Sequence, residues 1–128
     1  MQFQVLQIIV PDAIHDDVNK FGHDYVAARH PLYAAVMATC FKGSDGYKPE
    51  FLQHFTVVAT VEADDLEEVF EIGNGYGNQQ NITRHHPMHS VSVGDIVSCR
   101  DDSGIYFQMV NGMGFRLLHS TQSEEVAA

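Results

Sequence analysis

A regular alternation of side chains between Phe55 and Glu62 is the feature that most constrains how this chain folds. Apolar residues alternate there with others that are mostly Thr and Glu. Because successive side chains of a strand point to opposite faces of a sheet, this period of two predicts a strand with one buried face. The sheet to which the strand belongs therefore needs a second apolar layer against that face.

A helix with both a start and a stop signal follows after a single residue, Ala63. Asp64 is the predicted N-cap of a helix that runs to Ile72, and Glu67 is its capping-box partner. Gly73 is the predicted stop. The predicted apolar stripe of this helix consists of Leu66, Val69 and Phe70. We expect this stripe to pack against the sheet.

The segment before this pair predicts one strand and two helical stretches. Gln2 to Val10 is rich in Val, Ile, Leu and Phe and has apolar residues on both faces, which is typical of a central strand. Helical spacing behind an Asp cap predicts a helix from Asp12, weakened at Gly22, and Pro31 opens a second helical stretch. The composition of residues 43–49 predicts a loop.

The last third of the chain predicts three short strands that are joined by tight turns. The strands are Asp95 to Arg100, Ile105 to Val110 and Phe115 to His119. The first turn runs through Asp101 to Gly104, and the second contains the Asn111-Gly112 pair that is typical of hairpins. This part of the chain therefore predicts an antiparallel meander.

Together these elements predict an α/β fold, of the α+β kind in the stricter sense. We expect a mostly antiparallel twisted sheet with two to three helices on one face and a small curled β-sheet at the C-terminal end. A chain of 128 residues is long enough to bury a core of its own. We expect a single globular domain over residues 1–119 and a flexible tail over residues 120–128.

The chain is strongly acidic. Its 17 Asp and Glu residues against 7 Lys and Arg residues give a formal net charge of −10, spread along the sequence. A field of this sign repels phosphate backbones and anionic membranes, which argues against nucleic-acid and membrane partners. The same field could attract a basic partner or mimic nucleic acid, although solubility alone is the simpler interpretation.

The cysteine content, the N-terminal segment and the hydropathy together predict where the protein is located. Cys40 and Cys99 are the only cysteines, too few for the disulfide framework of a small secreted domain. Met1 leads straight into the first predicted strand without a basic leader, so we expect no signal peptide. Apolar runs are too short to span a membrane. The expected location is the cytoplasm.

Three histidines lie close together: His85, His86 and His89. Three imidazoles at this spacing could supply half of a zinc or nickel site. Pro87 disfavours the regular helix that would align them, and Cys99 or Asp95 would have to fold over the site as a further ligand. A polar loop is the simpler interpretation, and we expect no metal, no cofactor and no catalytic residue.

A loop rich in Gly and Asn follows the predicted helix. Its glycines come after a helix C-terminus, whereas phosphate-binding glycine loops precede a helix N-terminus, so we reject nucleotide binding. Long polar loops on a rigid frame commonly carry recognition. We predict that residues 74–89 bind a partner protein or a small polar ligand. The predicted contact residues are Asn74, Tyr76, Asn78, Asn81, Arg84, His85, His86 and His89.

An ordered set of motifs runs through the second half of the chain. The set is Glu67-Glu68-Val69-Phe70 followed by Asn74, then Ser90 to Val97 (Ser-Val-Ser-Val-Gly-Asp-Ile-Val), then Tyr106 and Gly114-Phe115. It resembles the YodL-like group, small proteins and domains of phages, plasmids and other mobile elements. The insertion Gly75 to Gln80 makes the central loop longer than in that group. The resemblance implies a mobile-element accessory protein and carries over no catalytic residue, because the group has no agreed activity.

The step Val93-Gly94-Asp95 also has a structural interpretation. Gly94 is suited to a bend between strands, and the Asp95 side chain can bond to nearby backbone and hold the turn. Phe115 would then place its ring over the stripe of the predicted helix. On this interpretation the motif is scaffold.

The function that these observations favour is a non-enzymatic accessory protein of a phage or mobile element in the host cytoplasm. It would bind a host protein or sequester a small polar ligand, for example to blunt a defence system. A virion or assembly component and a small metal-dependent enzyme that uses the three histidines are the alternatives. Apolar residues on both sides of the first strand leave homo-oligomer formation open.

Overall fold

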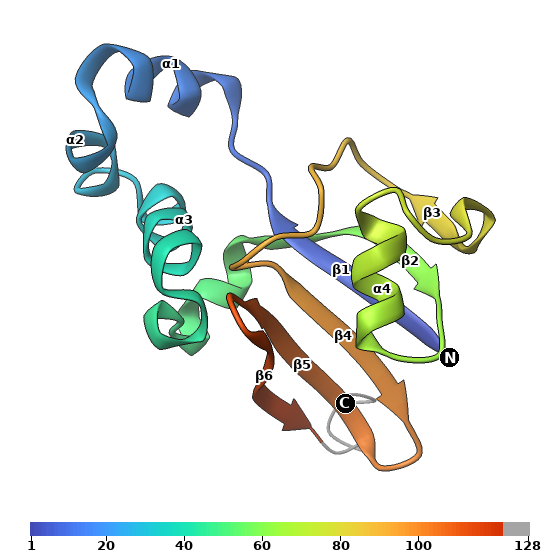
Figure 1. Ribbon diagram of the computed structural model, residues 1–128. Coiled ribbons are helices and arrows are strands. Elements are labelled where there is room, and N and C mark those ends of the chain that lie inside the picture. Colours follow the sequence, from blue (N-terminus) through green and yellow to red (C-terminus); the bar gives the residue numbers. More distant parts are fainter. Residues whose placement is uncertain (122–128) are drawn as a thin grey trace.

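The computed structural model describes residues 1–121, which form one open six-stranded antiparallel sheet and several helices (Figure 1). The order of the strands across the sheet is β3-β2-β1-β4-β5-β6. The strands are β1 Gln2–Ile8, β2 Phe55–Glu62, β3 Ile82–Arg84, β4 Ile96–Asp101, β5 Gly104–Asn111 and β6 Gly114–Thr121. The predicted α+β class is confirmed. The predicted C-terminal strands extend this sheet and do not form a separate one.

The helices lie in two separate regions of the molecule. They are α1 Asp12–Phe21, α2 His23–Ala27, α3 Pro31–Lys42 and α4 Leu66–Gly73, with 3-10 helices η1 Gly43–Gly46, η2 Pro49–His54 and η3 Gln79–Asn81. Among the α-helices of residues 1–121, only α4 lies across a face of the strands, whereas α1, α2 and α3 form an arm that projects from one end of the sheet (Figure 1). The prediction of two to three helices on one face was therefore wrong for the arm. Because it projects beyond the strands, α1 buries no residue, and Phe21 at its end is 53% exposed.

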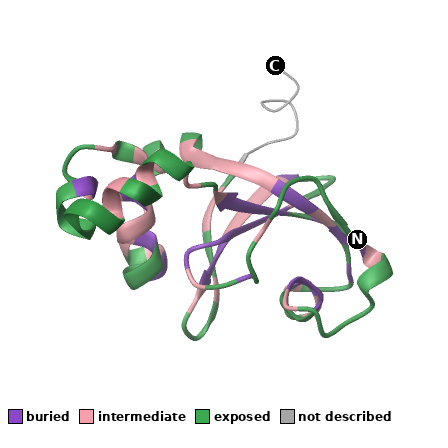
Figure 2. Ribbon diagram, turned by 90° about the horizontal axis from the view of Figure 1, so that it is seen from above, coloured by how far each residue is buried: buried purple, intermediate pink, exposed green. Residues whose placement is uncertain are grey.

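The main core lies between α4 and the sheet. Figure 2 shows buried segments along the strands and on α4, whereas most of the arm is exposed or half-buried. Strand residues that belong to this core are Phe3, Val5, Val58, Ala59, Val61, Val97 and Val110. Val69 and Ile72 meet them from α4. Gly73 lets the following chain approach closely, because a Cβ there would lie 2.3 Å from Val91 Cγ2.

A smaller core lies on the opposite face. Its buried members are Leu6, Ile96 and Met109, and Tyr47 and Leu52 cover them from η2 and the chain before it. The alternation of β2 serves both cores, because its pairing with β1 shifts register between Val5 and Leu6. Phe55 and Val57 pack on the second core, and Ala59 and Val61 on the first. The predicted single buried face of β2 is therefore divided by a β-bulge.

The N-terminal cap of α4 lies one residue later than predicted. Asp65 is the N-cap, and its Oδ1 accepts a hydrogen bond from the Glu68 backbone N at 2.9 Å. In return, Glu68 Oε1 accepts from the Asp64 backbone N at 2.9 Å. The pairs Asp64-Asp65 and Glu67-Glu68 allow either register. The observed one buries Val69 and Ile72 and leaves Phe70 39% exposed, so the predicted stripe was wrong at Phe70.

Several predicted boundaries shift. β1 ends at Ile8 and not at Val10, and the short strand β3 was not predicted. β6 runs to Thr121, so the flexible tail predicted from residue 120 was wrong for its first two positions, and residues 122–128 lie outside the described part. Among residues 1–121, no helix has both the length and the apolar character needed to cross a bilayer.

Candidate functional site

Two of the asparagines predicted to make contacts stabilise the ends of local helices. Asn74 Nδ2 donates to the Phe70 carbonyl oxygen at 2.7 Å at the C-terminus of α4. Asn78 Oδ1 accepts from the Gln80 backbone N at 3.0 Å and caps η3. Tyr76, between them, is 80% exposed. Asn81 is half-buried at the end of η3. Asn74 and Asn78 therefore have a structural use, and Tyr76 is an aromatic side chain of this stretch that is open to a partner.

The three clustered histidines point to different surroundings. The backbone N atoms of His85 and His86 both lie within bonding distance of the Val58 carbonyl oxygen, and His85 Nε2 lies 2.8 Å from Thr60 Oγ1. His86 is exposed, whereas His89 contacts β1. In residues 1–121, no three His, Cys, Asp or Glu side chains are grouped so that they could hold a metal ion. The histidine half-site that the sequence allowed is therefore not assembled, because the chain just after β3 holds His85 and His86 beside β2, whereas His89 lies against β1.

Part of the predicted contact set shares one shallow hollow of about 190 Å³. Asn74, Arg84 and His89 line it together with Met88 and backbone of the Gly73–Gly75 turn. One guanidinium nitrogen of Arg84 lies 3.4 Å from Gln79 Oε1. The hollow is polar and positively charged in an otherwise acidic chain, so it is the part of the segment suited to a small polar ligand.

The turn before β4 matches its predicted role. Gly94 has φ +96, and a Cβ there would lie 2.9 Å from the Thr39 carbonyl oxygen of α3, so both conformation and space require glycine. The Asp95 backbone N donates to the Ser92 carbonyl oxygen, and Asp95 Oδ2 accepts from the Ser92 backbone N, both at 3.0 Å. The carboxylate thus holds the bend, as the sequence indicated.

Asp95 is also the centre of a buried polar cluster that the sequence did not reveal. Only 5% of Asp95 is exposed, and Gln7 of β1 donates from Nε2 to Asp95 Oδ2 at 2.9 Å and to the His89 carbonyl oxygen at 3.0 Å. Burial raises the pKa of Asp95 to about 6, although His89 and the hydrogen bonds from Ser92 and Gln7 lower it. The signal that could have found Gln7 is its position: it is a polar residue between the apolar pairs Val5-Leu6 and Ile8-Ile9.

The imidazole of His89 completes the cluster. Its Nδ1 lies 2.7 Å from the Ser90 carbonyl oxygen and 3.2 Å from Gln7 Nε2, and its Nε2 lies 3.9 Å from Asp95 Oδ1. The imidazole thus lies at the edge of the buried carboxyl group, where its charge lowers the pKa of Asp95 while burial raises it.

A small cavity of about 50 Å³ lies beside this cluster, with Cys40 of α3 on its wall. Burial and the charge of Asp95 both raise the pKa of the Cys40 thiol, which keeps it protonated and weakly nucleophilic. A space of this size holds about one or two water molecules. Cys40, His89 and Asp95 thus share a wall without forming an activated nucleophile.

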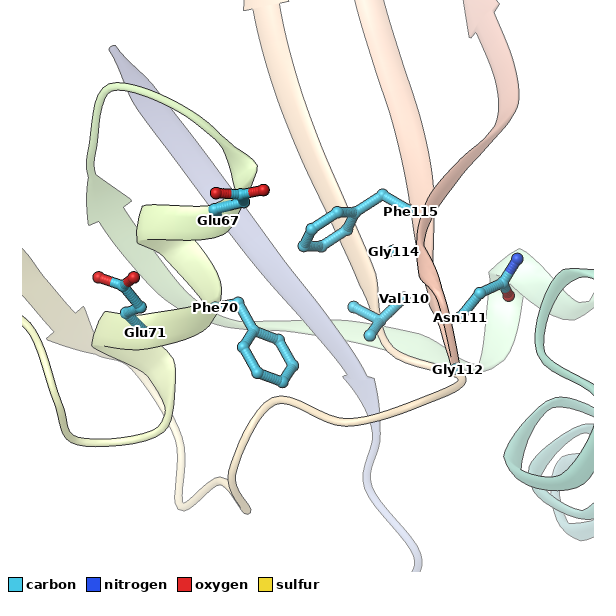
Figure 3. Close-up of a pocket in the computed structure, with 8 residues that line it drawn as sticks. All are labelled: Glu67, Phe70, Glu71, Val110, Asn111, Gly112, Gly114 and Phe115. Carbon is cyan, nitrogen blue, oxygen red and sulfur yellow. The ribbon is translucent and has the colours of Figure 1, made fainter.

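The open groove between α4 and the β5–β6 hairpin is the more substantial surface feature, with a volume of about 380 Å³ (Figure 3). Val110 is its buried floor, and Phe70 and Phe115 line it from α4 and from β6. Phe115 packs against the main core, but the two rings face a shared space and do not stack on each other (Figure 3). The predicted cover of the helix stripe by Phe115 is therefore only partial, because Phe70 has turned out of the stripe.

Two carboxylates line the same groove. Glu67 and Glu71 lie one helical turn apart on α4, and neither forms an ion pair with any residue in positions 1–121. Sequence reasoning missed this groove because it assigned Phe70 to the core and Glu67 to the cap. The signal in the sequence was a large aromatic residue, Phe70, with one acidic residue about a turn before it (Glu67) and another directly after it (Glu71).

Comparison with protein-family models, with curated proteins and with solved structures finds no match for this chain. The resemblance to the YodL-like group therefore stays a prediction that depends on its motifs. The positions of those motifs are now known: Glu68 and Asn74 cap α4, Asp95 holds the turn before β4, and Phe115 borders the groove.

Proposed function

We propose that this chain is a non-enzymatic protein-binding protein, and that the groove between α4 and the β5–β6 hairpin receives its partner. One observation carries the proposal: Phe70 is 39% exposed on a helix that otherwise turns its large apolar side chains inward, and it faces Phe115 across an open space of about 380 Å³. Exposed aromatic residues in concave surfaces are the usual anchors of protein and ligand recognition. Leaving this ring in water is unfavourable unless a partner covers it.

The cluster around Asp95 supports binding over catalysis as the main activity. Its hydrogen bonds go to Ser92 and Gln7, which hold the turn and join it to β1. The adjoining cavity of about 50 Å³ is far smaller than the pockets of about 300–1,000 Å³ that receive small molecules. The groove, in contrast, falls within that range. The Asp95 cluster is therefore explained by its structural role in holding the turn, and the groove by the binding of a partner.

The biological setting is proposed from the motifs. The resemblance to the YodL-like group supports an accessory protein of a phage or mobile element that acts on a host protein in the cytoplasm, for example against a defence system. The hollow lined by Asn74, Arg84 and His89 supports a second candidate, a small polar ligand bound by the central segment.

A peptide-display selection on the full chain separates these two surfaces. The chain is immobilised, random peptides are selected on it, and each selected peptide is then measured on Phe70→Gln and on Tyr76→Gln. Phe70→Gln replaces the groove anchor by a polar residue that suits a helix, whereas Tyr76→Gln changes a more exposed aromatic residue of the central segment. We expect Phe70→Gln to abolish binding and Tyr76→Gln to leave it unchanged.

The opposite pattern would move the binding surface to the central segment. Selected peptides that bind both variants as well as the original chain would overturn the proposal for the groove. Circular dichroism and the thermal midpoint of each variant check that the fold is retained, so that a loss of binding is not mistaken for unfolding.

A further inference from the structure

The groove concentrates an electrostatic conflict that the folded chain does not resolve. Glu67 and Glu71 are four residues apart on α4, a spacing that brings their Cβ atoms to about 5–6 Å on the helix surface. Two like charges at this spacing repel one another and destabilise a helix. Both residues line the groove, and the Glu71 carboxylate points to the side of α4 away from Phe115 (Figure 3).

Carboxylates are stabilised at the N-terminus of α4 and destabilised at its C-terminus. Asp65 and Glu68 at the N-terminus are used in the cap, where negative charge is also favoured by the helix dipole. Glu71 lies in the last turn, at the negative end of the dipole, and that turn has no basic residue. Glu71 is therefore unfavourable for the helix on two counts, the dipole and its neighbour Glu67.

Basic residues of the chain do not relieve this conflict. Arg116 follows the groove residue Phe115, but successive strand residues point to opposite faces, and its Nη1 lies 3.4 Å from Asp45 Oδ1. Each ion pair within residues 1–121 involves a carboxylate other than Glu67 and Glu71. The positive charge that would complement this rim must come from another molecule.

We propose that the groove binds a cationic apolar segment of a protein partner. An apolar side chain of that segment lies between Phe70 and Phe115, and a neighbouring Lys or Arg pairs with Glu67 and Glu71. This inference rests on the proposed function and adds the chemistry of the partner. The proposal explains why an exposed aromatic residue and two unpaired carboxylates occur around one opening: each lacks a complement that such a segment supplies.

The proportions of the groove suit this pairing. A Lys or Arg side chain can lay its apolar stem along a ring such as Phe70 while its charged end reaches the carboxylates. An Arg guanidinium can also bond to more than one acceptor at once through its planar fork. The net charge of −10 attracts a cationic partner from a distance, which predicts association that slows as salt is added.

The test uses peptides selected by display on the full chain and then synthesised. Each is paired with a matched peptide in which every Lys and Arg is replaced by Gln. Affinities are measured at low and high salt on four proteins: the original chain, Glu67→Gln/Glu71→Gln, Phe70→Gln and the control Glu50→Gln. Glu50 is an exposed residue of η2, away from the groove lining, and its substitution removes the same charge.

We expect the selected peptides to be enriched in Lys and Arg beside apolar residues. Loss of each carboxylate should weaken binding by roughly two- to fivefold, as for exposed ion pairs, and Glu50→Gln should leave it nearly unchanged. The Gln-substituted peptides should bind the original chain more weakly and lose most of the salt dependence. Because the substituted carboxylates lie in solvent, the double variant should fold normally.

Two other results have separate meanings. Peptides that need Phe70 but show no enrichment in Lys or Arg, and bind the double variant unchanged, would overturn the cationic partner and leave the proposed function standing. Peptides that bind Phe70→Gln as well as the original chain would remove the groove itself, and the inference would fail together with the proposed function.

Discussion

One face of the sheet is closed by α4 over β1 and β2 and open beside the β5–β6 hairpin. On the closed half, Val5, Val61 and Val69 are fully buried. On the open half, Phe115 is half-buried and Leu117, two positions along β6, is 53% exposed. Both halves belong to one antiparallel sheet, so backbone pairing does not explain the difference. The difference is that no described helix covers the hairpin on this face, whereas η2 lies against its other face.

A single helix separates the two halves. Ile72 of α4 is 1% exposed and packs into the core, whereas Phe70, two residues earlier, faces the groove. A short helix can thus meet the needs of folding with one side and present a binding surface with the other. We therefore expect substitutions on the closed side to change stability and substitutions on the open side to change binding.

The largest expected effect is the loss of Ile72. Ile72→Ala removes a buried side chain from a packed core and should lower the free energy of unfolding by about 2–5 kcal/mol. Phe70→Gln, a partly exposed position on the same helix, should lower it by no more than about 1 kcal/mol. Chemical denaturation of both variants measures the difference. Equal losses would mean that Phe70 is a core residue and that the two halves are not distinct.

A second effect tests the buried carboxyl group of the closed half. The folded chain raises the pKa of Asp95 from 3.8 to about 6, so the folded state holds this proton more tightly than the unfolded state. The stabilising contribution of protonated Asp95 is complete below pH of about 4 and is lost as the pH rises through about 6. The expected loss across this window is about 3 kcal/mol.

Asp95→Asn isolates this contribution, because asparagine keeps an oxygen for the Ser92 backbone N but does not titrate in the window. We expect the unfolding free energy of the original chain, minus that of the variant, to fall between pH of about 4 and 6. Denaturation curves at several pH values give that difference. The contributions of the other carboxylates cancel in it, including that of Asp101, whose pKa is lowered by hydrogen bonds from Ser103. A constant difference would mean that Asp95 is not buried as described.

A third effect tests the cap that starts α4. Asp65→Ala removes the acceptor of the Glu68 backbone N and should lower the free energy of unfolding by about 1 kcal/mol. Asp64 supplies only its backbone N to the capping pair, so Asp64→Ala should have a much smaller effect. Thermal unfolding of the two variants compares them directly. A larger loss for Asp64→Ala would restore the capping register that the sequence predicted.

The parts of the fold that local patterns determine were predictable from the sequence. The strand at Phe55–Glu62, the helix that begins at Pro31 and the three C-terminal strands follow from alternation, caps and turn residues. The bulge in β2 could not be predicted, because it depends on the register that β1 adopts beside it. In the same way, two adjacent acidic pairs left two capping registers for α4, and packing selected one.

The candidate site was less predictable because it depends on contacts between distant residues. Gln7 and Asp95 are 88 positions apart and meet only when β1 and β4 pair. The groove likewise needs Phe70 to turn away from the core and the hairpin to stop short of α4. The polar loop was chosen as a binding surface by composition alone, and composition does not show which of its side chains serve as caps, as Asn74 and Asn78 do.

The smallest expected effect is also the most specific test of the open half. Glu71→Gln removes the repulsion with Glu67 and the negative charge at the C-terminus of α4, and it should stabilise the free protein by about 0.5 kcal/mol. This corresponds to a thermal midpoint higher by about 2 °C. Glu50→Gln removes one negative charge as well, so the rise in thermal midpoint must exceed that of this control. Since natural chains tolerate such conflicts mainly where function needs them, a substitution that raises stability and weakens peptide binding would mark Glu71 as a binding residue. A midpoint that does not rise above the Glu50→Gln control would mean that the open half holds no unresolved charge.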